Sequence, residues 1–271
     1  LLRLLTKRNE IAICRGPIAT ELALGSFRKV IYDGRAAVKA EVEEFDVTGN
    51  KQLGKDFIKA EKNAVVKSDY RIAVSNKLVE YWKREFGYQG DQHIVIPCTL
   101  TSKSSGELLT KENDDSIKLV YSGGIGAWQS FELVANLCRK AIKENANVNV
   151  LFLTKENAII KKLIQEFPDR CERSWLKHEE VYEALSNCDY GILIRKQNAT
   201  NQVASPVKFA EYLNAGLKVL ISKNLGDFTE FVKKNDCGIV IEDEITDLIS
   251  VTPSERKRSN ELANQYFYKS S

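Results

Sequence analysis

One helical segment carries the residue types that hold a phosphate. Ser205 is suited to cap a helix, Pro206 fits its first turn, and Gly216 is placed to end it. Free backbone N–H groups and the positive end of the helix dipole attract a phosphate, and Lys208 adds a full charge in the first turn. Glu211 follows one turn later and offers a carboxylate to ribose hydroxyl groups. This combination predicts a site for a nucleoside diphosphate.

The same residues also have a purely structural interpretation. Ser-Pro pairs are common at the starts of helices, and Lys208 with Glu211 at positions i and i+3 can form a solvated surface pair. Both interpretations predict a helix here. They differ in whether the carboxylate binds a ligand.

A glycine-rich turn is the second candidate for ligand binding. Gly123 and Gly124 follow a predicted strand, and glycines let a backbone approach a ligand closely. The third glycine of a GxGxxG fingerprint falls on Gln129, so the turn is not a dinucleotide motif, and an ordinary tight turn is the alternative. Arg195 also follows a strand, although it could be an ordinary surface arginine. Because the carboxyl ends of parallel strands share one edge, we expect these residues to lie together.

Short apolar runs alternate with longer amphipathic ones, which predicts βαβ units with parallel sheets. In the second half, strands are expected at Ile117–Ser122, Val148–Thr154, Tyr190–Arg195, Lys218–Ser222 and Gly238–Glu242. In the first half, they are expected at Ile11–Cys14, Val30–Tyr32, Arg71–Val74 and His93–Pro97. Apolar residues between Phe131 and Ile142 recur on one helix face, so this helix packs on the core.

The length of 271 residues suggests about two domains. The polar, non-periodic stretch 99–115 indicates a linker between a first domain at 1–98 and a second at 116–252. The first half has fewer strands than a complete doubly wound domain, and the sequence contains no methionine. We therefore expect the first domain to be incomplete, through truncation or disorder.

The composition argues against several classes of function. A net charge of +3, spread along the chain, argues against binding to nucleic acid. No apolar run approaches the roughly 20 residues that span a bilayer, and no signal peptide is evident, which predicts a cytoplasmic protein. The six cysteines form no CxxC pair and there are only two histidines, so no metal site is expected.

Four stretches resemble GT-B fold glycosyltransferases of family four, in particular bacterial polysaccharide and capsule enzymes (glycosyltransferase group 1). They are Asp69–Ser75, Ile94–Pro97, Tyr121–Gly124 and, most specifically, Ser205–Gly216. The similarity spans about residues 10–268. It implies two Rossmann-like domains that face each other across a cleft, of which the second binds a nucleotide sugar and the first binds the acceptor. It also implies retention of the anomeric configuration without a metal or cofactor.

The resemblance carries over unevenly to individual residues. Glu211 matches the second glutamate of the family's paired-glutamate motif, which holds the ribose hydroxyls. The first glutamate would fall on Val203, so the usual contact with the sugar is absent. The basic pair that grips the diphosphate in the family would fall on Gly124 and Gln129, and both charges are missing.

Other residues must then bind the diphosphate, because leaving such charge desolvated and unpaired costs several kcal/mol. We expect Lys208 and Arg195 to do so, since the planar guanidinium group binds phosphate oxygens in pairs. In the first domain, Asp33 and Arg35 lie where the family carries a catalytic residue beside the transferred sugar. The structural alternative for this pair is a plain Asp-Gly turn.

The expected function is transfer of a sugar, with retention, from a nucleotide-sugar donor to a glycan or lipid-linked acceptor. The resemblance places this reaction in bacterial surface polysaccharide synthesis (capsule or lipopolysaccharide), at the inner face of the membrane. It also implies that a helix at 254–268 packs back on the first domain. Three alternatives stay open: a non-catalytic nucleotide-sugar-binding module, a sugar-nucleotide epimerase on the same fold, and a Rossmann oxidoreductase, which the broken fingerprint disfavours.

Overall fold

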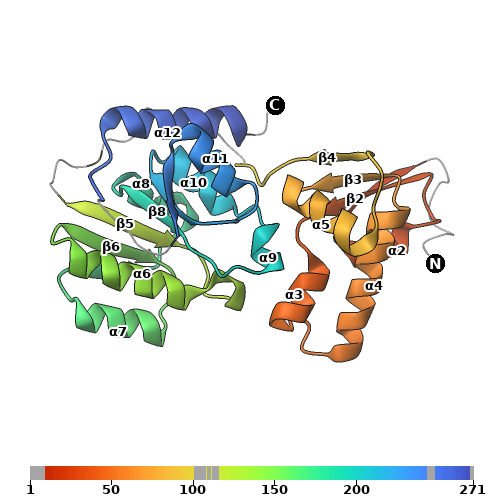
Figure 1. Ribbon diagram of the computed structural model, residues 1–271, viewed down its shortest axis with the longest axis horizontal. Coiled ribbons are helices and arrows are strands. Elements are labelled where there is room, and N and C mark those ends of the chain that lie inside the picture. Colours follow the sequence, from red (N-terminus) through yellow and green to blue (C-terminus); the bar gives the residue numbers. More distant parts are fainter. Residues whose placement is uncertain (1–9, 101–107, 109–110, 112–115, 243–247, 269–271) are drawn as a thin grey trace. The chain divides into compact units, whose positions relative to one another are not determined.

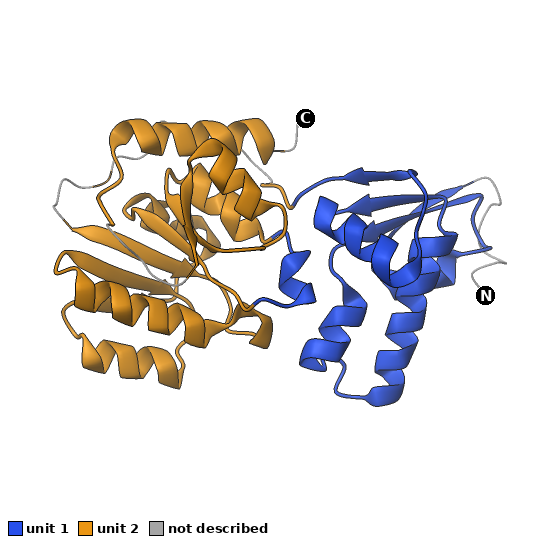
Figure 2. Cartoon of the chain, in the orientation of Figure 1, with its two compact units in different colours: residues 1–97, 197–205 blue, residues 98–196, 206–271 orange. Residues whose placement is uncertain are grey.

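The computed structural model describes residues 10–100, 108, 111, 116–242 and 248–268. It divides the chain into two compact units (Figure 2). Unit 1 comprises Leu1–Pro97 and Gln197–Ser205, and unit 2 comprises Cys98–Lys196 and Pro206–Ser271. Most of the expected linker, 99–115, lies outside the described residues. Residues 197–205, which the sequence places in the second domain, belong to unit 1.

Unit 1 contains a four-stranded parallel sheet whose strands lie in chain order. The strands are β1 (Ile11–Arg15), β2 (Lys29–Gly34), β3 (Tyr70–Ala73) and β4 (His93–Val95). The helices are α2 (Pro17–Ala23), α3 (Val38–Phe45), α4 (Lys51–Lys67), α5 (Asn76–Phe86) and the short α9 (Ala199–Gln202). The strands match the prediction closely.

Within the described residues of unit 1, helices cover one face of this sheet. Consecutive parallel strands joined by right-handed connections in one direction place all their helices on the same side, as the arrangement of α3 and α4 in Figure 1 illustrates. Tyr32 and Ala73 are buried beneath the helices, while Ile11, Ile13 and Ile94 on the opposite face are exposed. All-parallel sheets normally carry helices on both faces. The described residues of unit 1 therefore form four strands with helices on one face of the sheet, and the expectation that the first domain is incomplete stays a prediction.

Helix α9 is held within unit 1 at both of its ends. The Glu44 carboxylate accepts hydrogen bonds from the backbone N–H groups of Ala199 (2.7 Å) and Thr200 (3.0 Å), in the first turn of α9. At the other end, the Ser75 hydroxyl donates to the carbonyl of Val203 (2.7 Å). These bonds explain why residues 197–205 pack with unit 1, although their neighbours in sequence belong to unit 2.

Unit 2 contains a six-stranded parallel sheet with the order β10-β9-β8-β5-β6-β7. The strands are β5 (Ile117–Ser122), β6 (Val148–Leu153), β7 (Cys171–Ser174), β8 (Tyr190–Leu193), β9 (Lys218–Ser222) and β10 (Gly238–Ile241). The helices are η1 (Ala127–Gln129), α6 (Phe131–Glu144), α7 (Ala158–Glu166), α8 (His178–Ser186), α10 (Val207–Asn214), α11 (Phe228–Asn235) and α12 (Pro253–Tyr266). This is the doubly wound order. Strands β6 and β7 are added on one side of β5, and β8, β9 and β10 are then added on its other side, so the order of strands reverses between β5 and β8.

The core of unit 2 forms where the sequence predicts it. Val134 and Cys138 of α6 pack against Leu119 and Phe152 of the sheet. Helix α12 packs against α10 and β9 of the same unit, and its buried Arg256 donates to backbone carbonyls there. The contact of this helix with the first domain, which the resemblance implies, stays a prediction.

Candidate functional site

The site is built around the point where the order of strands in unit 2 reverses. β5 and β8 are neighbours there, with Val120 opposite Gly191. Ligands of doubly wound proteins bind outside the carboxyl ends of the two strands at this switch point. In this chain, Gly123 and Gly124 follow β5, and Arg195 follows β8. Three predicted residues therefore lie at the edge where the fold places a ligand.

The glycine turn after β5 keeps its backbone open. Gly123 has a φ of 157°, and its N–H group donates to the carbonyl of Leu153 (3.3 Å). The Tyr121 hydroxyl donates to the carbonyl of Gly124, and Gly124 itself is exposed. A side chain at Gly124 would meet no atom within 4 Å. A ligand can therefore approach this turn without displacing a protein group.

Arg195 is a buried cation at the switch point. Its backbone N–H group donates to the Ser222 hydroxyl (2.7 Å), which fixes the end of β8. Burial lowers the pKa of Arg195, and the neighbouring Tyr121 and Tyr212 raise it. An arginine remains charged at neutral pH even so. The sequence identified Arg195 only as a residue after a strand; its burial beside two tyrosines is what the fold adds.

Helix α10 is locked onto the sheet at the same place. The hydroxyl of Tyr212 on α10 accepts a hydrogen bond from the backbone N–H group of Ser122 (2.9 Å), at the end of β5. A Cβ at position 191 would lie 2.2 Å from the Tyr212 ring, so Gly191 allows α10 to pack closely on β8. This contact explains how the sequence brings α10 to the switch point.

The predicted cap of α10 is wrong. The helix begins at Val207 and the residue before it is Pro206, while Ser205 belongs to unit 1. Pro206 is extended (φ −66°, ψ 124°), and its carbonyl accepts a hydrogen bond from the backbone N–H group of Phe209 (3.1 Å). Proline rather than serine therefore precedes the first helical residue. The predicted end of the helix is confirmed, because Gly216 follows it in the left-handed conformation (φ 81°).

Lys208 and Glu211 form an ion pair on α10. The Nζ and Oε2 atoms are 2.5 Å apart, and the side chains are 27% and 18% exposed. The contact that the structural interpretation predicts is therefore present, although the pair is partly buried rather than solvated. Within the described part of the chain, the other Glu211 carboxylate oxygen, Oε1, has no hydrogen-bond donor.

Two further residues at this edge escaped the sequence analysis. Lys155 follows β6 and Trp175 follows β7. The Lys155 ammonium group lies 5.5 Å from the centre of the Trp175 ring, which is 62% exposed. An exposed indole at the ligand-binding edge can stack on a flat base. Trp175 was a usable signal, but β7 was not predicted, so the position of this tryptophan at a strand end was missed.

In unit 1, Asp33 and Arg35 form an ion pair, while their predicted catalytic role stays a prediction. The buried Asp33 carboxylate contacts the Nε atom of Arg35 (2.8 Å) and that of Arg15 (3.3 Å), at the carboxyl ends of β1 and β2. Arg15 lies directly opposite Asp33 in the sheet register. The carboxylate is therefore engaged by two guanidinium groups, an arrangement in which it orients them.

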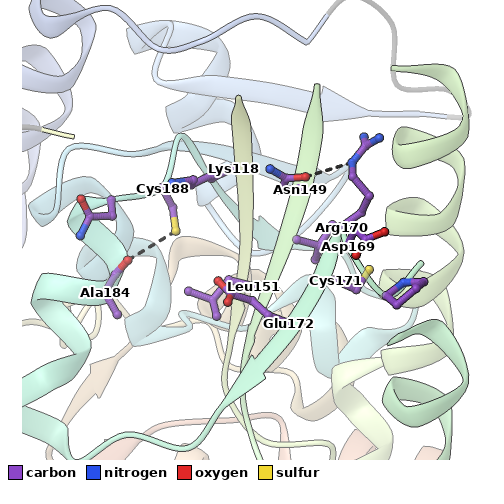
Figure 3. Close-up of a pocket in the computed structure, with 12 residues that line it drawn as sticks. Lys118, Asn149, Leu151, Asp169, Arg170, Cys171, Glu172, Ala184 and Cys188 are labelled. Carbon is purple, nitrogen blue, oxygen red and sulfur yellow. Dashed lines mark hydrogen bonds between the residues drawn. The ribbon is translucent and has the colours of Figure 1, made fainter. Parts of the chain in front are cut away.

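A hollow of about 310 Å³ in unit 2 lies elsewhere (Figure 3). It is lined by the first residues of β5, β6 and β7, at the opposite end of the strands from the switch point, and by the end of α8. Burial raises the pKa of the Cys171 thiol to about 11 and that of Cys188 to about 12, so both stay protonated and unreactive at neutral pH. None of the predicted site residues lines this hollow.

Among the described residues, no three His, Cys, Asp or Glu side chains are grouped so that they could hold a metal ion. In the same part of the chain, no helix combines the length and the apolar character needed to cross a membrane.

Comparison with solved structures decides the fold. A sucrose-phosphate synthase from Thermosynechococcus elongatus superimposes with a TM-score of 0.70 at 14% identity, covering 95% of this chain and 69% of that one. TarM of S. aureus, in a complex that contains UDP, gives 0.65 at 12% identity, covering 97% and 50%. The chain has the fold of GT-B glycosyltransferases. HepE of Anabaena, in complex with UDP, gives 0.64 at 14% identity, covering 93% and 71%.

These GT-B structures are longer than the chain, which spans 50% of TarM. No protein-family model matches the sequence, and no curated protein matches it.

Proposed function

We propose that the chain transfers a sugar from a nucleotide-sugar donor to an acceptor. The observation that carries the proposal is the meeting of the glycine turn, the buried Arg195 and helix α10 at the switch point of a doubly wound sheet. Proteins of the same fold, TarM and HepE, have been crystallised with UDP. These facts support a nucleoside diphosphate as the donor's leaving group.

Each residue of the site has a role in this proposal. Arg195 and Lys208 neutralise the diphosphate, which accumulates charge as the bond to the sugar breaks. The free oxygen of Glu211 accepts hydrogen bonds from the ribose hydroxyls, and Trp175 stacks on the base. Gly123 and Gly124 supply a backbone surface for the donor, and Ser205 with Pro206 leads into α10.

The finer features of the reaction are proposals of the same kind. Asp33 and Arg35 act beside the transferred sugar; the anomeric configuration is retained, and no metal or cofactor takes part. The acceptor is a glycan or a lipid-linked sugar used for bacterial surface polysaccharide, and the protein acts at the cytoplasmic face of the membrane. The resemblance of the α10 segment to bacterial polysaccharide enzymes supports this group of proposals.

One observation favours a second candidate, a nucleotide-sugar-binding module without catalysis. Val203 stands where the family carries its first glutamate, and its side chain is buried in unit 1. Gly124 and Gln129 occupy the positions of the family's basic pair. A protein that has lost these groups could bind the donor and leave it unchanged.

Thermal stabilisation by UDP in the presence of EDTA tests the donor site. A ligand at 100 times its dissociation constant adds about 2.7 kcal/mol of stability. Arg195→Gln should weaken the binding of UDP much more than that of uridine, because only UDP carries phosphates. Arg258→Gln, which changes an exposed arginine on α12, is the matched control and should bind both ligands normally.

Three results would contradict parts of the proposal. Strict dependence on a divalent cation would exclude the metal-independent mechanism. An equal loss of UDP and uridine binding in Arg195→Gln would show that the phosphate contact is assigned wrongly. Stabilisation by a panel of nucleotide sugars with neither transfer to acceptors nor hydrolysis would favour the binding module.

A further inference from the structure

The arginine pair on Asp33 has a geometry that a structural ion pair does not require. Arg15 and Arg35 each contact one oxygen of the same carboxylate, and both do so through Nε. Among the described residues, Asp33 is the partner of both guanidinium groups, so their terminal nitrogens have no protein acceptor. A guanidinium group held through Nε still presents two terminal nitrogens for a bidentate contact with phosphate or carboxylate.

The positive charge of this cluster lies on its exposed side chains, whereas the negative charge is buried. The Asp33 side chain is 8% exposed, whereas those of Arg35 and Arg15 are 39% and 75% exposed. A buried carboxylate needs a cationic partner, and one arginine is sufficient for that purpose. The second arginine leaves the cluster with one surplus positive charge, carried by the exposed groups.

The backbone around the cluster is fixed. The N–H group of Gly16 donates to the carbonyl of Asp33 (3.2 Å), which ties the end of β1 to the end of β2. A Cβ at Gly34 would lie 2.5 Å from the Trp82 ring, so this ring packs directly against the strand behind Asp33. The two arginines therefore start from a rigid strand edge, and Asp33 restricts their remaining freedom.

We propose that Arg15 and Arg35 bind an anionic group of the acceptor, a phosphate or a carboxylate, with Asp33 as the positioning residue. This inference rests on the proposed function, because it assigns the acceptor to unit 1. The two arginines lie at the carboxyl ends of β1 and β2, the edge at which parallel α/β sheets bind ligands. An acceptor that carries a negative charge would be selected over its neutral counterpart.

Three small probes test the proposal on the whole chain with saturating UDP: glucose 6-phosphate, glucuronate and glucose. Binding is measured by ligand-observed NMR titration. At least one charged probe should bind more tightly than glucose, and the difference should shrink as salt rises. The comparison between glucose 6-phosphate and glucuronate identifies which anion is preferred.

Arg15→Gln and Arg35→Gln should each weaken the preferred charged probe about tenfold, the effect of losing a charge-assisted hydrogen bond. Asp33→Asn should weaken it as well, although no positive charge is removed. Arg28→Gln, at the opposite end of β2, is the matched control and should bind normally. Far-UV circular dichroism verifies that each variant is folded, and Arg15→Lys replaces Arg15→Gln if the latter is not.

The outcomes separate this proposal from the proposed function. UDP binding together with equal affinity for charged and neutral probes overturns the acceptor proposal alone. So does an equal loss of affinity in Arg28→Gln and Arg35→Gln. If none of UDP, ADP, GDP and dTDP binds, the proposed function fails. The titration of the charged probes without a nucleotide still decides whether the arginine pair binds anions.

Discussion

Replacing Glu211 with glutamine separates a ligand-binding role from a structural one. The substitution keeps the size of the side chain and most of its helix propensity, but it exchanges a charged acceptor for a neutral one. In the structure, Oε2 of Glu211 pairs with Lys208, and Oε1 lacks a donor among the described residues. The question is whether Oε1 binds the ribose.

The two roles predict effects of different size on different quantities. An i, i+3 ion pair on a helix contributes about 0.2–0.5 kcal/mol to stability, so the free energy of unfolding should barely change. Hydrogen bonds to a charged group contribute about 1.5–3 kcal/mol. Their loss should weaken the binding of UDP roughly ten- to a hundredfold.

Isothermal titration with UDP and with dUDP measures this effect. Wild type should bind dUDP more weakly than UDP, because dUDP lacks one ribose hydroxyl, and Glu211→Gln should show a smaller difference between the two ligands. Glu230→Gln is the matched control, since Glu230 pairs with Lys233 at the same i, i+3 spacing on α11 and both side chains are more than half exposed. Unchanged UDP affinity in Glu211→Gln would refute the assignment of the donor site to α10.

Two further predictions concern Trp175 and Glu61. Trp175→Ala should weaken the binding of UDP by about 0.5–1.5 kcal/mol and leave the binding of inorganic diphosphate unchanged, because diphosphate has no base to stack. An equal loss of affinity for both ligands in titrations would contradict the stacking role. Burial raises the pKa of Glu61 from 4.5 to about 7, although hydrogen bonds from the backbone N–H groups of Lys39 and Val38 act to lower this pKa. The folded state then binds this proton more tightly than the unfolded state, so the contribution of Glu61 to stability should fall by about 3 kcal/mol as the pH rises from about 4.5 to about 7. Urea unfolding at pH 5 and pH 8 measures this effect: Glu61→Gln should gain stability relative to wild type only at pH 8. The same difference in the free energy of unfolding between variant and wild type at both pH values would contradict the raised pKa.

The sequence predicted those elements that local chemistry defines. β5 and β9 are mostly apolar and are buried on both faces of a parallel sheet, and their bounds were predicted without error. The end of α10 was predicted because the position after a helix often adopts a left-handed backbone, which Gly216 takes up without steric cost. β7 was missed because the edge strand Cys-Glu-Arg-Ser has one fully buried residue and no apolar run.

The site was predicted as a set of strand ends, but its geometry was not. The expectation that Gly123 and Arg195 lie near each other needed only the rule that parallel strands end at one edge. That β5 and β8 are neighbours follows from the strand order, which no local pattern records. The Ser205 cap failed for a related reason. The start of the helix depends on where the chain passes from unit 1, at Ser205, to unit 2, at Pro206, and that is a long-range property.

The packing of residues 197–205 in unit 1 offers a physical reason for valine at position 203, where the resemblance would place a glutamate. Val203 ends this segment; its side chain is buried, and its carbonyl is bonded to the Ser75 hydroxyl. A glutamate in the same place would have to bury a charge, which costs several kcal/mol without a cationic partner. Valine fits the packing of α9 in unit 1, where the Glu44 carboxylate holds the first turn of the helix. With Val203 buried in unit 1, Glu211 is the one carboxylate between residues 203 and 216, so in our proposal the recognition of the ribose depends on its Oε1 oxygen.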